Sequence, residues 1–157
     1  MWFDSAIRHA GWYDNEQEGL ISMQMLQNFK AEILLAEDDP DQSDMLRETL
    51  EDEGYSVDTA FSGDVALKKL LSGGYDLAIL DVRMPGMTGD LVLRHFKQMN
   101  PAPKTKVVVL TAFATDEQMA RYRADGADAT CSKPYDITEF LHIVQYLRNR
   151  DSEKRQP

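Results

Sequence analysis

The chain has 157 residues, of which 43% are hydrophobic and 28% are charged, proportions typical of one globular domain with a sizeable core. Its formal net charge of −10 argues against nucleic acid or an anionic membrane as a direct partner, because both bind basic surfaces. The single cysteine, Cys131, favours a reducing compartment, so we expect a cytoplasmic protein. No apolar run is long enough to predict a membrane span.

Short apolar segments alternate with longer amphipathic segments along most of the chain. The short segments have the continuous apolar character of strands that are buried on both faces, and the longer ones repeat apolar residues with the period of a helix. In chain order, the pattern predicts strand 32–36, helix 40–53, strand 55–60, helix 63–72, strand 76–81, helix 90–100, strand 106–112, helix 115–126, strand 127–132 and helix 136–150.

Helix start and stop signals support this reading. Asp39 stands where an N-cap belongs, Pro40 occupies the first helical position, and Gly54 follows the end of the same helix. Gly73 and Gly74 end the second helix in the same way. The boundaries therefore rest on capping chemistry as well as on periodicity.

Five strands that alternate with five helices predict an α/β protein with a doubly wound, five-stranded parallel sheet. Helices cover both faces of such a sheet, which explains why the strands are apolar throughout. In this architecture the ligand site lies beyond the carboxyl ends of the strands, where the winding reverses. The residues that follow each strand are therefore the candidates for chemistry.

Polar side chains of complementary kinds stand at these strand ends. Glu37, Asp38 and Asp39 follow the first strand, and the third strand ends in Asp81. The fold should gather these carboxylates, which repel one another unless a cation joins them. Several carboxylate oxygens suit a hard divalent cation, so the sequence predicts Mg²⁺ rather than zinc.

The remaining strand ends carry groups that can bind a phosphoryl group. Thr111 ends the fourth strand and offers a hydroxyl, while Lys133 follows the fifth and offers an ammonium. Phosphoryl transfer typically uses such a set of groups, namely a metal, a cation and a hydrogen-bond donor around one carboxylate. Asp81 is the best-placed nucleophile, because carboxylates form aspartyl phosphates.

This set of strand-end residues resembles the receiver domain of two-component response regulators, which has a flavodoxin-like fold. The resemblance covers about Ala31 to Arg148 and rests on Glu37-Asp38, Asp81 with the loop MPGMTG, Thr111-Ala112 and Lys133-Pro134. It implies that Asp81 accepts a phosphoryl group from a histidine kinase or a histidine phosphotransfer protein. Thr111 and Lys133 would bind that group. Glu37, Asp38, Asp81 and the backbone carbonyl of Arg83 would bind Mg²⁺, directly or through water.

Two residues qualify the resemblance. Asp39 falls one position after the metal-binding pair of the family and is better explained as a helix cap. Thr130 stands three residues before the lysine, where receivers usually carry Tyr or Phe, so the mode of output is open. Tyr135 or Phe113 could replace the missing aromatic side chain.

Two other functions compete with a phosphoacceptor. The first is a protein-binding module of receiver type that works independently of phosphate. The second is a phosphatase or phosphotransferase, but such enzymes typically need a second acid two residues after the nucleophile, where this chain has Arg83. We therefore expect no conventional enzyme, only catalysis of the protein's own phosphorylation and dephosphorylation.

The predicted domain organisation is simple. Residues 1–30 form an N-terminal arm, flexible or weakly docked, residues 31–148 the receiver domain, and residues 149–157 a charged tail. The sequence leaves open whether the arm docks, mediates dimerisation or belongs to the native start. Because no second domain follows the last helix, we expect a stand-alone receiver that signals to a downstream protein target by contact. The sequence does not indicate the oligomeric state.

Overall fold

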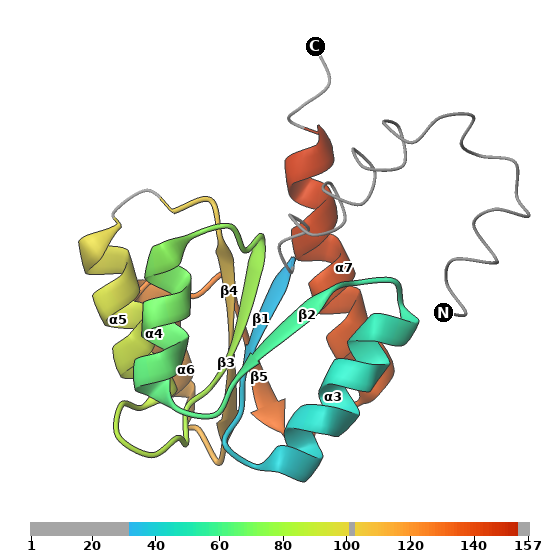
Figure 1. Cartoon of the computed structure of the whole chain (residues 1–157). Helices are drawn as coiled ribbons and strands as arrows, with labels where there is room; N and C mark the ends of the chain where they lie inside the picture. The colour runs from blue at the N-terminus through green and yellow to red at the C-terminus, as the bar shows by residue number, and fades with distance from the viewer. Residues whose placement is uncertain (1–31, 101–102, 154–157) are drawn as a thin grey trace, which may run out of the picture. The chain divides into compact units, whose positions relative to one another are not determined.

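The computed structural model describes residues 32–100 and 103–153, with only the backbone of residues 151–153. The predicted N-terminal arm therefore lies outside the described residues. Strands and helices alternate throughout the described part (Figure 1). In chain order they are β1 (Ile33–Ala36), α3 (Pro40–Asp52), β2 (Val57–Ala60), α4 (Gly63–Ser72), β3 (Leu77–Asp81), α5 (Gly89–Met99), β4 (Lys106–Ala112), α6 (Asp116–Ala124), β5 (Ala129–Lys133) and α7 (Ile137–Glu153).

The five strands form one parallel sheet in the order β2-β1-β3-β4-β5, which confirms the predicted doubly wound α/β fold. Helices α3 and α7 cover one face of the sheet, and α4, α5 and α6 cover the other (Figure 1). Strand residues alternate between the two core layers. Leu34 and Leu80 belong to the layer under α4 and α5, whereas Leu35 and Ile79 belong to the layer under α3 and α7.

The local signals read from the sequence operate as expected in helix α3. The Asp39 carboxylate accepts hydrogen bonds from the backbone N–H groups of Asp41 and Gln42, and Pro40 begins the helix. Helix α4 ends at Ser72, and Gly73 at its C-cap has a φ of 79°. Capping residues thus set the residue at which α3 begins after β1 and the residue at which α4 ends.

Two boundaries differ from the predicted elements. Strand β5 begins at Ala129 rather than 127, and Lys133 is its last residue instead of following it. Helix α7 continues to Glu153, past the predicted helix end at 150. No proline or glycine occurs between 148 and 153, so nothing in the sequence stops this polar turn. Among the described helices, none is long and apolar enough to cross a membrane.

Candidate functional site

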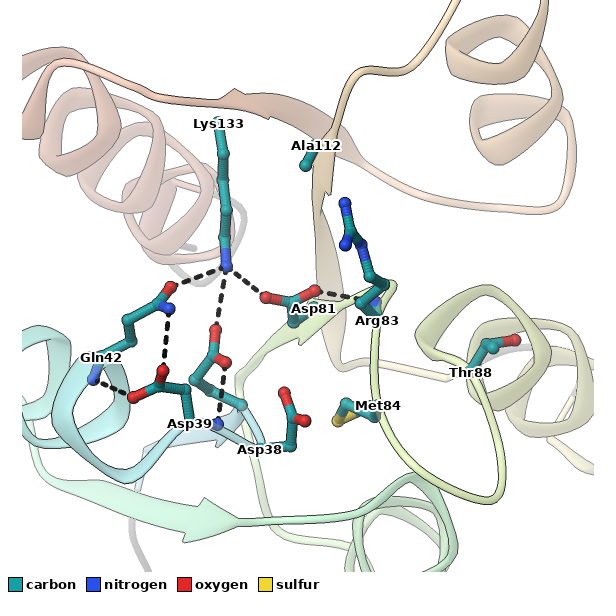
Figure 2. A pocket seen from close by; sticks show the side chains of 10 residues that line it. Asp38, Asp39, Gln42, Asp81, Arg83, Met84, Thr88, Ala112 and Lys133 are labelled. Carbon is teal, nitrogen blue, oxygen red and sulfur yellow. Dashed lines mark hydrogen bonds and ion pairs between the residues drawn. The ribbon is translucent and has the colours of Figure 1, made fainter.

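The carboxyl ends of β1, β3 and β5 surround a pocket of about 510 Å³ (Figure 2). We call it the acceptor pocket. Asp81 closes β3, Lys133 closes β5, and the acidic residues that follow β1 face them from a third side. The pocket is lined by Glu37, Asp38, Asp39, Gln42, Asp81, Arg83, Met84, Thr88, Ala112 and Lys133.

The Lys133 ammonium lies between two buried carboxylates. Its Nζ donates to Oε2 of Glu37 at 3.0 Å and to Oδ2 of Asp81, and a third hydrogen bond reaches Oε1 of Gln42 at 3.2 Å. The side chains of Glu37 and Asp81 are only 4% and 7% exposed, so water contributes little to solvating their charges. Lys133 therefore supplies the cation that these acids need within the protein itself.

Burial and crowding change the protonation of the pocket. Burial is the main cause that raises the pKa of Glu37 to about 7, and the nearby Asp81 carboxylate adds to it against the opposing effect of Lys133. Burial lowers the pKa of Lys133, but its hydrogen bonds to Asp81 and Glu37 outweigh burial, so that pKa rises overall. The ammonium stays charged, whereas Glu37 titrates near neutrality.

The loop after β3 folds back tightly on Asp81. The backbone N–H of Arg83 donates to Oδ1 of Asp81 at 2.8 Å, and the N–H of Gly89 closes the loop onto the carbonyl oxygen of Val82 at 3.0 Å. A Cβ on Gly89 would stand 2.1 Å from the carbonyl oxygen of Asp81, so no other residue fits there without a shift. The loop thus orients the Asp81 carboxylate through its own backbone.

Thr111 takes a different position from the other predicted site residues. It is buried near the end of β4, one residue past Leu110, which pairs with Asp81. The next residue, Ala112, lines the acceptor pocket, but Thr111 is not among the lining residues. The structure therefore brings Glu37, Asp38, Asp81, Arg83 and Lys133 around one pocket and places Thr111 beside it.

The donor set is chemically suited to Mg²⁺. Among the described residues, no group of three or more His, Cys, Asp or Glu side chains is arranged to hold a metal ion. Magnesium does not need such a cage, because it is usually held by one or two carboxylates together with waters and phosphate oxygens. Asp38 and Asp81 both line the pocket and can supply these carboxylates, although Lys133 pairs with Asp81 as well as with Glu37.

Gln42 is a pocket residue that the sequence analysis did not single out. It lies in the first turn of α3 and joins the Lys133 ammonium to the Asp39 cap. A partial signal was present, because Asp39 and Gln42 have the spacing of a capping box. Met84 and Thr88 also line the pocket, but no sequence pattern distinguished them from the rest of their loop.

A second, mainly apolar groove of about 650 Å³ adjoins the acceptor pocket and shares Gln42, Ala112 and Lys133 with it. Its other walls come from α3, the segment after β4 and the start of α7. Three large apolar side chains in it face solvent: Met45 is 57% exposed, Phe113 89% and Ile137 40%. Exposed apolar groups gathered beside a polar pocket are typical of a surface that contacts another protein.

Comparison with known proteins identifies sequence relatives. The transcriptional regulatory protein DltR of Streptococcus agalactiae is 34% identical over 120 residues, which are 76% of this chain and 52% of DltR. The response regulator ArlR of Staphylococcus aureus is 32% identical over 78% of this chain and 55% of its own length. The chain thus spans about half the length of the curated relatives it matches.

Solved structures give the same picture over nearly their whole length. The response regulator TrrA of Thermotoga maritima, in complex with Mg²⁺ and BeF, is 35% identical with a TM-score of 0.65, and the match covers 75% of this chain and 99% of TrrA. The chemotaxis protein CheY4 of Vibrio cholerae is 30% identical with a TM-score of 0.68, over 76% and 99%. The family model of the response regulator receiver domain matches residues 33–145, and the chain belongs to that family.

Proposed function

We propose that this receiver domain is a phosphoacceptor in two-component signalling and that Asp81 carries the phosphoryl group. A carboxylate oxygen of Asp81 attacks the phosphorus of a phosphohistidine. The bond between phosphorus and the histidine nitrogen breaks as the bond to Asp81 forms, which leaves an aspartyl phosphate on this chain and a free histidine on the donor. Turnover is limited to the protein's own phosphorylation and dephosphorylation.

The observation that carries this proposal is the position of Asp81. Its carboxylate closes β3 at the floor of an open pocket, is held through Oδ1 by the N–H of Arg83, and faces the Lys133 ammonium through Oδ2. The nucleophile is thus oriented before any substrate arrives, which lowers the entropic cost of reaction. Lys133 is placed to move from the carboxylate to a phosphoryl oxygen as negative charge develops there.

Asp38 and Asp81 would hold Mg²⁺, with the backbone carbonyl of Arg83 as a third ligand and Glu37 acting directly or through water. When bound, the metal supplies positive charge to the transferring phosphoryl oxygens. The relative TrrA was solved with Mg²⁺ and BeF, which supports the same metal here. Thr111 lies one backbone step from the pocket wall, and we propose that its hydroxyl binds a phosphoryl oxygen once Asp81 is modified.

A histidine kinase or a histidine phosphotransfer protein is the proposed donor, and a downstream protein is the proposed target. The apolar groove beside the acceptor pocket supports contact with a protein, because it brings an exposed apolar surface to the edge where Asp81 reacts. A cytoplasmic location fits the free thiol of Cys131. The alternative is a receiver-like module that binds its partner independently of phosphate. That alternative does not account for the ion pair between Asp81 and Lys133 in the open pocket.

Intact mass after incubation with acetyl phosphate tests the proposal. Wild-type protein with Mg²⁺ should gain the mass of one phosphoryl group, because acetate can leave in place of histidine. Chelation of the metal should abolish the gain, and Asp81→Asn should not be modified, because an amide oxygen is a poor nucleophile. Asp116→Asn, exposed in the first turn of α6 and outside the pocket lining, is the matched control and should be modified normally.

A wild-type protein that gains no mass with Mg²⁺ would contradict the proposal and favour the module that binds its partner independently of phosphate. A gain that persists in Asp81→Asn would place the acceptor at another residue.

A further inference from the structure

Gln42 stands at a helix position whose side chain usually completes a capping box, but in this structure it makes other hydrogen bonds. It is the third residue after the Asp39 N-cap, where a glutamine side chain normally accepts a hydrogen bond from the backbone N–H of the cap residue. Helix α6 follows that rule: the N–H of Thr115 donates to Oε1 of Gln118 at 2.9 Å. Helix α3 has the same spacing but a different set of bonds.

At the start of α3, Glu37 takes the place of the glutamine. The N–H of Asp39 donates to Oε1 of Glu37 at 3.1 Å, so the Gln42 oxygen remains available. That oxygen accepts from Nζ of Lys133, while Nε2 of Gln42 donates to Oδ2 of Asp39 at 3.2 Å (Figure 2). Because a partner stands on each side, the orientation of the amide group is determined.

We infer that Gln42 is a positioning residue for phosphoryl transfer, holding the Lys133 ammonium beside Asp81. An ammonium has three N–H donors, and Glu37, Asp81 and Gln42 take all three. Two of these partners are carboxylates whose attraction for Lys133 weakens when Mg²⁺ or a phosphoryl group engages them. Gln42 is neutral and belongs to neither the proposed Mg²⁺ ligands nor the proposed phosphoryl ligands, so we expect its hydrogen bond to Lys133 to persist and to keep the ammonium from moving into solvent.

The Gln42 side chain is itself held in place by hydrogen bonds at the start of α3. Oδ1 of Asp39 accepts from the backbone N–H groups of Asp41 and Gln42, and Oδ2 of the same carboxylate fixes the Gln42 amide. The third acid of the Glu37-Asp38-Asp39 run thus has two tasks, capping α3 and supporting the glutamine that reaches Lys133. This inference rests on the proposed function, because Lys133 matters to the reaction only if Asp81 is the acceptor.

The test replaces Gln42 with methionine, which keeps the length of the side chain but removes both hydrogen bonds. The phosphorylation rate with acetyl phosphate at saturating Mg²⁺ should fall about ten- to a hundredfold, the range for one lost hydrogen bond to a charged group. The Mg²⁺ dissociation constant from calorimetry should change less than about twofold, because Gln42 binds no metal in the proposed set. General damage to the pocket would change both quantities.

Two further variants make the result decisive. Gln145→Met, on the exposed face of α7, is the matched control and should phosphorylate at the wild-type rate. Gln42→Glu restores an acceptor oxygen for Lys133 but loses the donor that Asp39 holds and adds a charge that repels the Asp39 carboxylate, so it should recover the wild-type rate only in part. A wild-type rate in Gln42→Met would overturn the inference. If wild-type protein gains no phosphoryl group, the proposed function itself fails.

Discussion

At the scale of single residues, the acceptor pocket is a compromise between reactivity and stability. Asp81 and Glu37 are almost fully buried, whereas the proposed function needs both as anions when Mg²⁺ or a phosphoryl group binds. Lys133 compensates part of their charge, but burial, together with the neighbouring Asp81, still raises the pKa of Glu37 to about 7. A buried acid with a strongly raised pKa beside a cation in an open pocket is the kind of group that functional sites contain, which supports the proposed role of this pocket.

We predict that the metal-free protein loses stability as the pH rises from about 4.5 to about 7. The pKa of Glu37 is raised to about 7, so the folded state holds this proton more tightly than the unfolded state does. The stabilisation that this proton provides is complete below the pKa of the unfolded state, about 4.5, and is lost as the pH rises through the pKa of the folded state, about 7. Glu37→Gln cannot ionise, so its stability relative to wild type should increase between pH 5 and pH 8, by at most about 3 kcal/mol.

Urea unfolding in the presence of a chelator, at several pH values, measures this difference. Glu48→Gln, an exposed glutamate in α3, is the control and should give a constant offset from wild type. A Glu37→Gln difference that is equally flat with pH would show that Glu37 titrates normally.

At the scale of elements, the starts of α4 and α5 hold the loop that carries Asp81. Gly63 and Gly89 are the first residues of these helices and are both buried. A Cβ on Gly63 would stand 1.8 Å from the carbonyl oxygen of Met87, and one on Gly89 would collide with that of Asp81. Neither has a left-handed φ, so glycine serves close approach of backbone rather than backbone freedom.

We predict that Gly63→Ala displaces the loop after β3 and weakens Mg²⁺ binding at least about fivefold, although Gly63 lies outside the acceptor pocket. Trimming a side chain cannot relieve the clash, because the atom approached belongs to the backbone. Isothermal titration with Mg²⁺ gives the affinity, and urea unfolding gives the stability. Ala66→Gly, buried in the same helix, should cost about 1 kcal/mol of stability while leaving the Mg²⁺ affinity unchanged. Equal affinities in the two variants would contradict the prediction.

At the scale of the whole domain, the fold concentrates negative charge at one edge of the sheet. The chain has a net charge of −10, and the three acids that follow β1 line the same pocket as Asp81. A ligand that binds only the folded state and neutralises this edge should stabilise the entire domain, because unfolding disperses the cluster.

We therefore predict that saturating Mg²⁺ raises the melting temperature by at least about 5 °C, the shift that corresponds to about 2 kcal/mol in a domain of this size. Asp38→Asn should reduce the shift by more than half, because it removes one proposed ligand. Sodium chloride at equal ionic strength separates binding from screening. An equal shift in the two salts would contradict a specific metal site.

The sequence alone determined the order of elements, the parallel sheet and the edge at which Glu37, Asp38, Asp81 and Lys133 meet. These follow from short-range rules, since apolar continuity, caps and the handedness of the crossovers leave few arrangements open. The extension of α7 to Glu153 was missed because a polar helix end carries no periodic signal. The domain limit at residue 30 and the roles of individual site residues remain predictions.

Only the tertiary structure decided which of these side chains meet and by which atoms. Lys133 and Gln42 are 91 residues apart, and no local pattern links them. Gln42 is available to Lys133 only because Glu37, instead of Gln42, accepts the hydrogen bond from the N–H of Asp39. Glycine is needed at 63 only because the carbonyl oxygen of Met87, in another loop, approaches it closely. Such contacts arise from the packing of distant segments, where displacements of a few tenths of an ångström decide the outcome. A sequence pattern therefore indicates the edge of the sheet, but the hydrogen bonds of the site come from the folded chain.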